Sequence, residues 1–150
     1  MKVLTTLNGA EETIEIAPER IYAMEPALGG FPDMRRYVLI NEEDSPVEWL
    51  QSLDDASVVF ALIEPFLFMP DYSFELSEAD MDGLGVESPD DVLVRCLVTL
   101  REDPSGITAN LLAPLIFSRR THLARQIILQ DSEMPIRFPL FEAIELAATA

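Results

Sequence analysis

The chain has a single histidine, His122, and a single cysteine, Cys96, and these are the side chains best suited to nucleophilic or metal chemistry. A cysteine nucleophile needs a base such as histidine beside it, and a zinc site needs several such ligands at short spacings. His122 lies in an expected turn after two arginines, and Cys96 lies in an apolar run, where a thiol usually packs as a small hydrophobe. Structural roles are therefore favoured for both residues, and a Cys–His pair brought together by the fold stays the alternative.

Residues 78–89 (EADMDGLGVESP) imitate a calcium-binding loop. The first, third and fifth positions are acidic (Glu78, Asp80 and Asp82), and the sixth is glycine. The twelfth position, which should supply a bidentate glutamate, is Pro89, and EF-hand helices are not expected on either side. The pattern therefore predicts no metal site.

Other catalytic motifs are missing from the sequence. It has no Gly-rich phosphate-binding loop, no nucleophile elbow and no HExxH zinc motif. Adjacent acidic residues such as Asp54 and Asp55 lie in expected turns and are typical of solvated surface, whereas general acid–base catalysis needs carboxylates that converge across the fold. The sequence therefore predicts neither an enzyme nor a bound cofactor.

Charge is the strongest feature of the composition. The 150 residues include 27 Asp and Glu against 10 Lys and Arg, a formal net charge of −17. The excess is uneven, with 23 acidic and 6 basic residues in 1–110 and 4 of each in 111–150. Such a field repels phosphate, so direct nucleic-acid binding is not expected, and it speeds association with a basic protein. Solubility alone is the simpler interpretation of the same acidity.

The sequence indicates no membrane segment. Its longest apolar stretch, 58–69, is interrupted by Glu64 and Pro65 and falls short of the ~20 residues that a spanning helix needs. The N-terminal residues do not have the pattern of a secretory signal, and a lone cysteine fits a reducing compartment. We therefore expect a cytoplasmic protein.

Short strands between turn signals dominate the pattern, with a hairpin expected around Asn8 and Gly9. The proline- and glycine-rich stretch 25–34 is expected to be a loop. The strands are expected at 2–7, 13–16, 36–43, 47–53, 57–68, 73–76, 92–100, 106–117 and 124–130.

Short helices are expected at three places. Ser77 is suited to cap a helix over 77–84, Pro89 to begin a helical turn over 88–91, and apolar residues share one face of a C-terminal helix over about 139–149. Together the elements predict a single domain over 1–150. Its fold class is mainly β, a small β-barrel-like or sandwich domain with two or three short helices.

The segment 106–117 (GITANLLAPLIF) is the least ordinary of the expected strands. It is almost wholly apolar, but Asn110 and Pro114 suit neither a helix nor a central strand. We expect it to form a hairpin with 92–100 and to be packed on both sides. Asn110 would then be satisfied by backbone groups at a bend, and Pro114 would lie at an edge or bulge.

The order of residues in this segment resembles the FliW family of flagellar assembly factors, and five further stretches resemble it in the same order. Each motif is weak alone, but six in register over roughly residues 10–130 are specific. The six are EPALGGF (25–31), WLQSLDD (49–55), PDYSFEL (70–76), DDVLVRCLVTL (90–100), TANLLAPLI (108–116) and RQIIL (125–129).

The resemblance implies a compact, non-enzymatic β-barrel-like domain that is monomeric when free. It implies binding to CsrA, a basic RNA-binding dimer that represses translation, and antagonism of its repression of flagellin mRNA. It also implies binding to cytoplasmic flagellin, which displaces CsrA. Two alternatives stay open: an acidic flagellin or export chaperone that does not bind CsrA, and a small-ligand-binding β-barrel or unrecognised hydrolase.

Four residues are the expected partner contacts. The two aromatic ones lie beside proline and glycine breaks, where partly exposed rings often anchor interfaces. Asn110 would offer its amide to a partner, and its alternative is an internal bend contact. Tyr72 and Phe74 alternate on one face and are expected in the core. The four contacts are Phe31, Phe68, Asp71 and Asn110.

Overall fold

The computed structural model describes residues 2–6, 10–41, 44–130 and 132–140. Within them, seven strands form a closed ring in the order β7-β6-β5-β4-β3-β10-β9, and β9 returns to β7. All neighbours in the ring are antiparallel except β10 and β3, which run parallel. The ring strands are β3 (Ile21–Met24), β4 (Arg36–Asn41), β5 (Val47–Ser52), β6 (Val59–Ile63), β7 (Val92–Thr99), β9 (Leu115–Ser118) and β10 (Leu123–Gln126).

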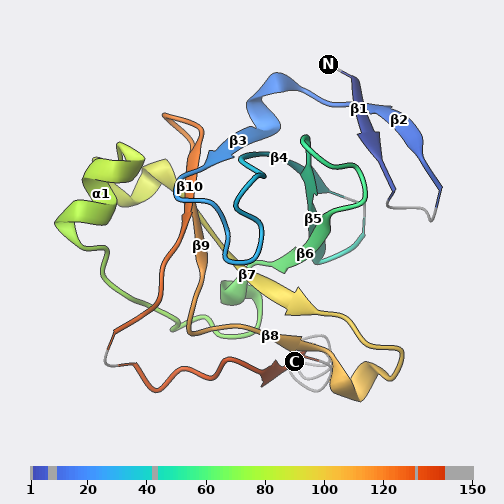
Figure 1. Cartoon of the computed structure of the whole chain (residues 1–150). Coiled ribbons are helices and arrows are strands. Elements are labelled where there is room, and N and C mark those ends of the chain that lie inside the picture. Colours follow the sequence, from blue (N-terminus) through green and yellow to red (C-terminus); the bar gives the residue numbers. More distant parts are fainter. Residues whose placement is uncertain (1, 7–9, 42–43, 131, 141–150) are drawn as a thin grey trace.

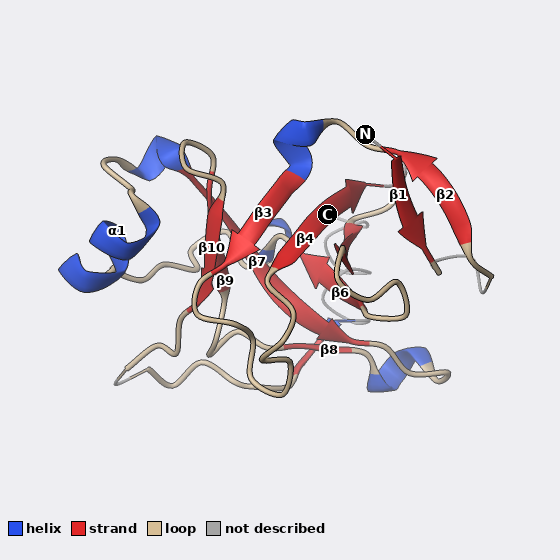
Figure 2. Cartoon of the chain, turned by 45° about the horizontal axis from the view of Figure 1, so that its top comes forward, coloured by secondary structure: helices blue, strands red, loops and turns tan. Residues whose placement is uncertain are grey.

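The remaining elements surround this barrel. Helix α1 (Glu78–Leu84) lies on one side of it, and a hairpin of β1 (Lys2–Thr5) and β2 (Glu12–Glu15) lies on the opposite side (Figures 1 and 2). Two-residue strands β8 (Thr108–Ala109) and β11 (Phe138–Pro139) extend the sheet beyond β7. The 3₁₀-helices are η1 (Pro18–Arg20), η2 (Pro65–Leu67), η3 (Pro89–Asp91) and η4 (Pro104–Gly106).

Strand β7 closes the barrel because its two halves pair with different neighbours. Its first half, from Val92 to Arg95, pairs with β9, whereas Cys96 and the two residues after it pair with β6. The β-branched residues of this strand suit a long, extended segment. One strand thus joins both ends of the ring.

The apolar side chains form two clusters. One fills the barrel and includes Tyr22, Tyr37, Leu50, Leu62 and Phe117. The other lies between the outer face of β7 and β9, α1 and the segment after β6. The 65–76 segment and α1 therefore cover apolar strand residues that the barrel interior does not bury.

A group of charged side chains shares the barrel face with the first cluster. Glu48 is paired with Leu62 across β5 and β6, so its side chain points to the same face as that buried leucine. Its carboxylate accepts a hydrogen bond from Arg95 Nε and lies 3.6 Å from Arg20 Nη2. Arg20, from η1, also donates to the Leu39 carbonyl oxygen at 3.0 Å. These contacts link η1, β4, β5 and β7 at one end of the barrel.

Most expected elements are confirmed. The mainly β class, the β1–β2 pairing, the capped helix at α1 and the helical turn at η3 are present. Ser77 accepts a hydrogen bond from the Asp80 amide, and Gly85 ends α1 with a φ of 68°. The hairpin turn at Asn8 and Gly9 and most of the expected helix over 139–149 lie outside the described residues.

Four expected strands are wrong in extent, and two strands were missed. The 124–130 strand is β10, which ends at Gln126, and the missed β11 includes Pro139, which was expected to begin the C-terminal helix. The 57–68 strand ends at Ile63 because Pro65 lacks an N–H for the ladder, and η2 follows. Residues 73–76 pair with no strand among the described residues. The 106–117 strand is split into β8 and β9. Strand β3 was not predicted, because its four residues directly precede a loop signal. None of the described helices is long and apolar enough to cross a membrane.

Candidate partner-binding surface

Asn110 forms the bend that splits the apolar segment. Its Oδ1 accepts hydrogen bonds from the amides of Leu112 and Ala113, each at 3.1 Å, and its own amide donates to the Leu97 carbonyl at 2.9 Å. This Asx turn takes the chain out of β8 and into β9, whose four residues are all buried. The expected alternative for Asn110, an internal bend contact, is therefore what the structure shows for its carbonyl oxygen.

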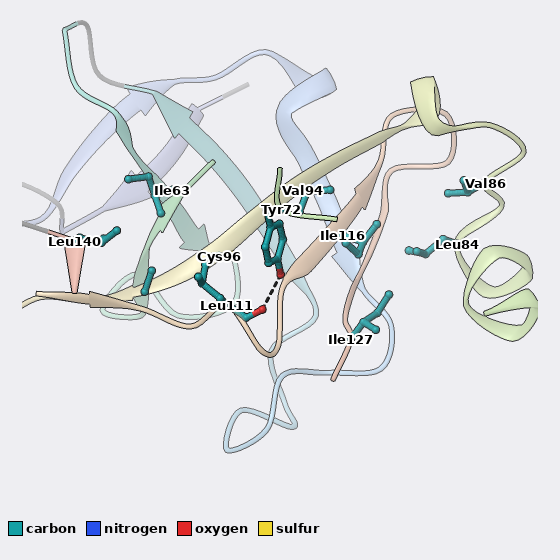
Figure 3. Packing of buried hydrophobic residues seen from close by; sticks show 11 residues of the cluster. Ile63, Tyr72, Leu84, Val86, Val94, Cys96, Leu111, Ile116, Ile127 and Leu140 are labelled. Atoms are coloured by element: carbon teal, nitrogen blue, oxygen red, sulfur yellow. Dashed lines mark hydrogen bonds between the residues drawn. The ribbon is translucent and has the colours of Figure 1, made fainter. Parts of the chain in front are cut away.

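Tyr72 joins the segment after β6 to this bend. Its hydroxyl donates to the Leu111 carbonyl at 2.6 Å, and its side chain is buried, as expected (Figure 3). The rings of Phe66 and Phe74 contact it with centroids 6.1 Å and 5.7 Å away. Two of the motifs quoted above, 70–76 and 108–116, therefore meet in space through one buried hydrogen bond.

Cys96 belongs to the same cluster and has no accessible surface. Burial raises the pKa of its thiol to about 12, and the neighbouring Tyr72 hydroxyl opposes this only in part. Burial also raises the pKa of the Tyr72 hydroxyl, and the neighbouring thiol adds to the effect. A thiol held in its neutral form in an apolar cluster is a packing residue rather than a nucleophile.

Cys96 is expected to resist alkylation and to make the fold sensitive to alkaline pH. The folded thiol binds its proton more tightly than the unfolded thiol. Its contribution to the free energy of unfolding is therefore complete below the unfolded pKa of about 8.5. That contribution is lost as pH rises through about 12. Iodoacetamide labelling at pH 8 should be slow in buffer and fast in urea. Cys96→Ala should flatten the fall of unfolding free energy above pH 9, and fast labelling of the folded protein would contradict the assignment.

His122 supports the parallel pairing of β10 with β3. It adopts a φ of 59°, and its Nδ1 lies 3.0 Å from the Ile21 carbonyl oxygen. Its ring stacks on Tyr22 with centroids 5.4 Å apart. These contacts give His122 the structural role expected from the sequence.

The acidic residues of the calcium-like stretch lie in α1, and one of them helps to attach this helix to the barrel. Asp80 accepts a hydrogen bond from Arg125 Nη1 at 3.0 Å, and Ser77 caps the helix start. A Cβ at Gly83 would lie 2.3 Å from the Arg125 guanidinium, so a glycine allows α1 to approach this arginine closely. Thr121 Oγ1 donates to the Leu84 carbonyl at 2.6 Å. The stretch therefore docks α1 on β10.

Three of the four expected contact residues, Phe68, Asp71 and Asn110, are linked through the residues that they adjoin. The fourth, Phe31, lies apart from them. Phe68 stacks on Phe138 with centroids 5.4 Å apart, and Phe138 pairs with Ala109, next to Asn110. Asp71 is exposed beside the buried Tyr72. Phe31 packs edge-to-face on Phe60, at the barrel cluster, with centroids 5.1 Å apart. Both phenylalanines are half-buried, which agrees with the partial exposure expected for them.

An apolar pocket of about 370 Å³ opens beside this group. Phe66, Tyr72 and Phe74 line one wall, and residues of β7 and β9 line another. Its polar lining comes from Ser73, Glu87 and Ser88 at the surface rather than from groups converging inside the barrel. This shape suits an apolar side chain of a protein partner better than it suits a small polar ligand. The pocket was not predicted, because its walls come from segments distant in sequence.

The comparisons with known proteins agree with this architecture. The sequence model of the FliW protein family matches residues 6–140. A flagellar assembly factor FliW from Syntrophus aciditrophicus is 36% identical over 143 residues, covering 95% of this chain and 89% of the relative. One from Desulfitobacterium hafniense is 38% identical over 153 residues, covering 99% and 97%.

A solved structure shows the same fold. The crystal structure of a flagellar assembly factor FliW superposes with a TM-score of 0.83 and 28% sequence identity. The match covers 94% of this chain and 97% of the solved chain. The resemblance drawn from the six motifs is thereby confirmed, and this chain belongs to the FliW family of flagellar assembly factors.

Proposed function

We propose that this protein is a non-enzymatic, cytoplasmic regulator of flagellum assembly that switches between two protein partners. It binds the translational repressor CsrA and antagonises its repression of flagellin mRNA. It also binds cytoplasmic flagellin, which displaces CsrA. Family membership supports the role in flagellum assembly, and the two partners are the ones that the family resemblance implies.

The charge of the chain is the observation that carries the choice of CsrA. A formal net charge of −17 attracts a dimer with basic RNA-binding edges and repels RNA from the complex that forms. Ion pairs within the chain cannot cancel this charge, because −17 is the excess of 27 carboxylates over all 10 lysines and arginines. The acidity is therefore free to act on a partner.

The contact surface that we propose includes Phe68 and Asp71 beside the apolar pocket. Asp71 is the sharpest test, because it is exposed and the structure gives its carboxylate no hydrogen bond or ion pair among the described residues. Phe31 and Asn110 stay candidates at lower rank. Phe31 lies apart from the group, and the Asn110 carbonyl oxygen is already used.

The proposal is tested by calorimetric titration with CsrA and with flagellin from the same organism, at two salt concentrations. We expect CsrA binding that weakens with salt and is lost when flagellin is bound first. Asp71→Asn should weaken binding, whereas Glu102→Gln, which removes a charge from an exposed site beyond β7, serves as the matched control. Size-exclusion chromatography should show a free monomer.

Each other outcome selects an alternative. Binding to flagellin alone would indicate an export chaperone that does not act on CsrA. Binding to neither would leave the small-ligand barrel, and salt-independent CsrA binding would remove the steering role of the charge.

A further inference from the structure

The edge of β10 that faces β3 is paired only over the first half of the strand. At its start, the Ala23 amide donates to the His122 carbonyl and the Glu25 amide to the Ala124 carbonyl, each at 2.8 Å. Beyond Glu25 the chain makes no further main-chain hydrogen bond with β10 among the described residues. The Glu25 carbonyl accepts instead from Arg125 Nε at 2.9 Å, and the same guanidinium is held by Asp80. Strand β3 therefore stops here.

The chain after β10 nevertheless continues in strand-like pairing on its other edge. The Ile127 amide donates to the Pro114 carbonyl at 2.9 Å, and the Leu129 amide to the Leu112 carbonyl at 2.8 Å. Because amides alternate in direction along a strand, that of Ile128 faces the side that β3 has left, and Gln130 begins the turn that follows. Within the described part of the chain, neither the Ile128 amide nor the Gln130 amide has a hydrogen-bond acceptor.

A second segment without strand pairing lies across this edge and leaves room between. Residues 73–77, 127–130 and Ser132 line a cavity of about 570 Å³ together with Asp80. The amides of Phe74, Glu75 and Leu76 also have no acceptor among the described residues. Two segments with unpaired main-chain groups thus face one cavity, whose apolar lining includes Phe74, Leu76 and Ile127.

The geometry points to a docking slot for an extended segment of a partner protein, which adds as a strand beside Ile128. An unpaired strand edge is satisfied by another main chain, and the pockets on either side select alternate side chains. Ile128, whose side chain is 64% exposed, would be covered by a cross-strand neighbour. The partner segment therefore carries apolar residues at alternate positions.

Charge defines the rest of the partner's chemistry. Glu75 lines the slot with a carboxylate that has no partner among the described residues, whereas Asp80 is paired with Arg125, and the lining residues include no lysine or arginine. The positions between the apolar residues of the partner are therefore lysine or arginine. A second copy of this chain is disfavoured as the occupant, because two chains with a net charge of −17 repel each other. This inference does not depend on whether CsrA or flagellin supplies the strand.

The test uses capped nine-residue peptides that alternate isoleucine or valine with lysine or threonine. We expect some of them to bind with protection from hydrogen exchange at Ile128, measured by NMR. The same peptides with glutamate in place of lysine should bind at least about tenfold more weakly. Failure of every peptide to bind, or binding without protection of this amide, would overturn the slot.

One substitution separates main-chain pairing from side-chain contact. Ile128→Pro removes an N–H that the free protein does not use, and Ile127 before it is already extended, as a residue preceding proline prefers. The melting temperature should be unchanged and peptide binding lost. Ile128→Val keeps the N–H and should bind as the parent does.

Two further results would contradict the proposal. Equal binding by the proline and valine variants would show that the main chain is not engaged. Protection of Ile128 that rises with protein concentration in the absence of peptide would make a second copy the occupant. Binding of CsrA or flagellin is measured separately, so failure of the partner switch and failure of the slot are distinguishable.

Discussion

Arg95→Met is expected to lower the free energy of unfolding by about 3–5 kcal/mol, because it leaves a buried carboxylate without its main partner. The Arg95 and Glu48 side chains are 13% and 12% exposed, and the Glu48 carboxylate would keep only the longer contact with Arg20. Urea denaturation followed by circular dichroism measures the change.

The double variant Arg95→Met with Glu48→Leu should recover most of this loss, because both buried charges are then removed. Arg35→Met is the matched control. Arg35 pairs with Glu25 at 3.1 Å, but both side chains are about half exposed, and such pairs contribute little to stability. A loss from Arg95→Met no larger than that from Arg35→Met would show that the barrel-end charges are not desolvated.

Tyr72→Ala is expected to lower the free energy of unfolding by about 3–5 kcal/mol, the usual range for an aromatic residue removed from a core. The side chain is 3% exposed, and its removal would also leave the Leu111 carbonyl without the hydroxyl. Tyr72→Phe keeps the ring and should lose only about 1–3 kcal/mol.

Thermal and urea unfolding of the two Tyr72 variants give both values. Because Tyr72 holds 65–76 against the 108–116 bend, Tyr72→Ala should also raise hydrogen exchange in both segments. Equal stability of the phenylalanine variant and the parent would mean that the Leu111 carbonyl accepts a hydrogen bond from water in place of the Tyr72 hydroxyl. Equal stability of the alanine variant would remove Tyr72 from the core.

The elements that were predictable depend on local chemistry. Ser77 and Gly85 mark the two ends of α1 by themselves, and the long β-branched run of β7 needs no partner to be recognised. The bend at Asn110 was also signalled locally, because asparagine and proline both interrupt a strand. Pro65 carried a similar signal, and extending the strand past it was the error.

What could not be predicted depends on segments far apart in the sequence. Glu48 and Arg95 are 47 positions apart, and each looks like an ordinary surface charge until the barrel closes. The apolar pocket and the slot are formed in the same way. Asp71 could be placed at the surface from its neighbours, but whether a partner touches Phe31, Phe68, Asp71 or Asn110 depends on a second molecule.

The parallel pairing of β10 with β3 has a consequence for how the protein is made. It joins Leu123 to Ala23, whereas β3 to β7 pair largely in chain order through shorter connections. Loop closure over such a span is slow compared with hairpin formation, so the ring closes after the meander has formed. A ribosome must therefore release nearly the whole chain before the barrel exists. Until then the growing polypeptide is an open sheet with two unprotected edges, and its heavy negative charge keeps such nascent chains from adhering to one another.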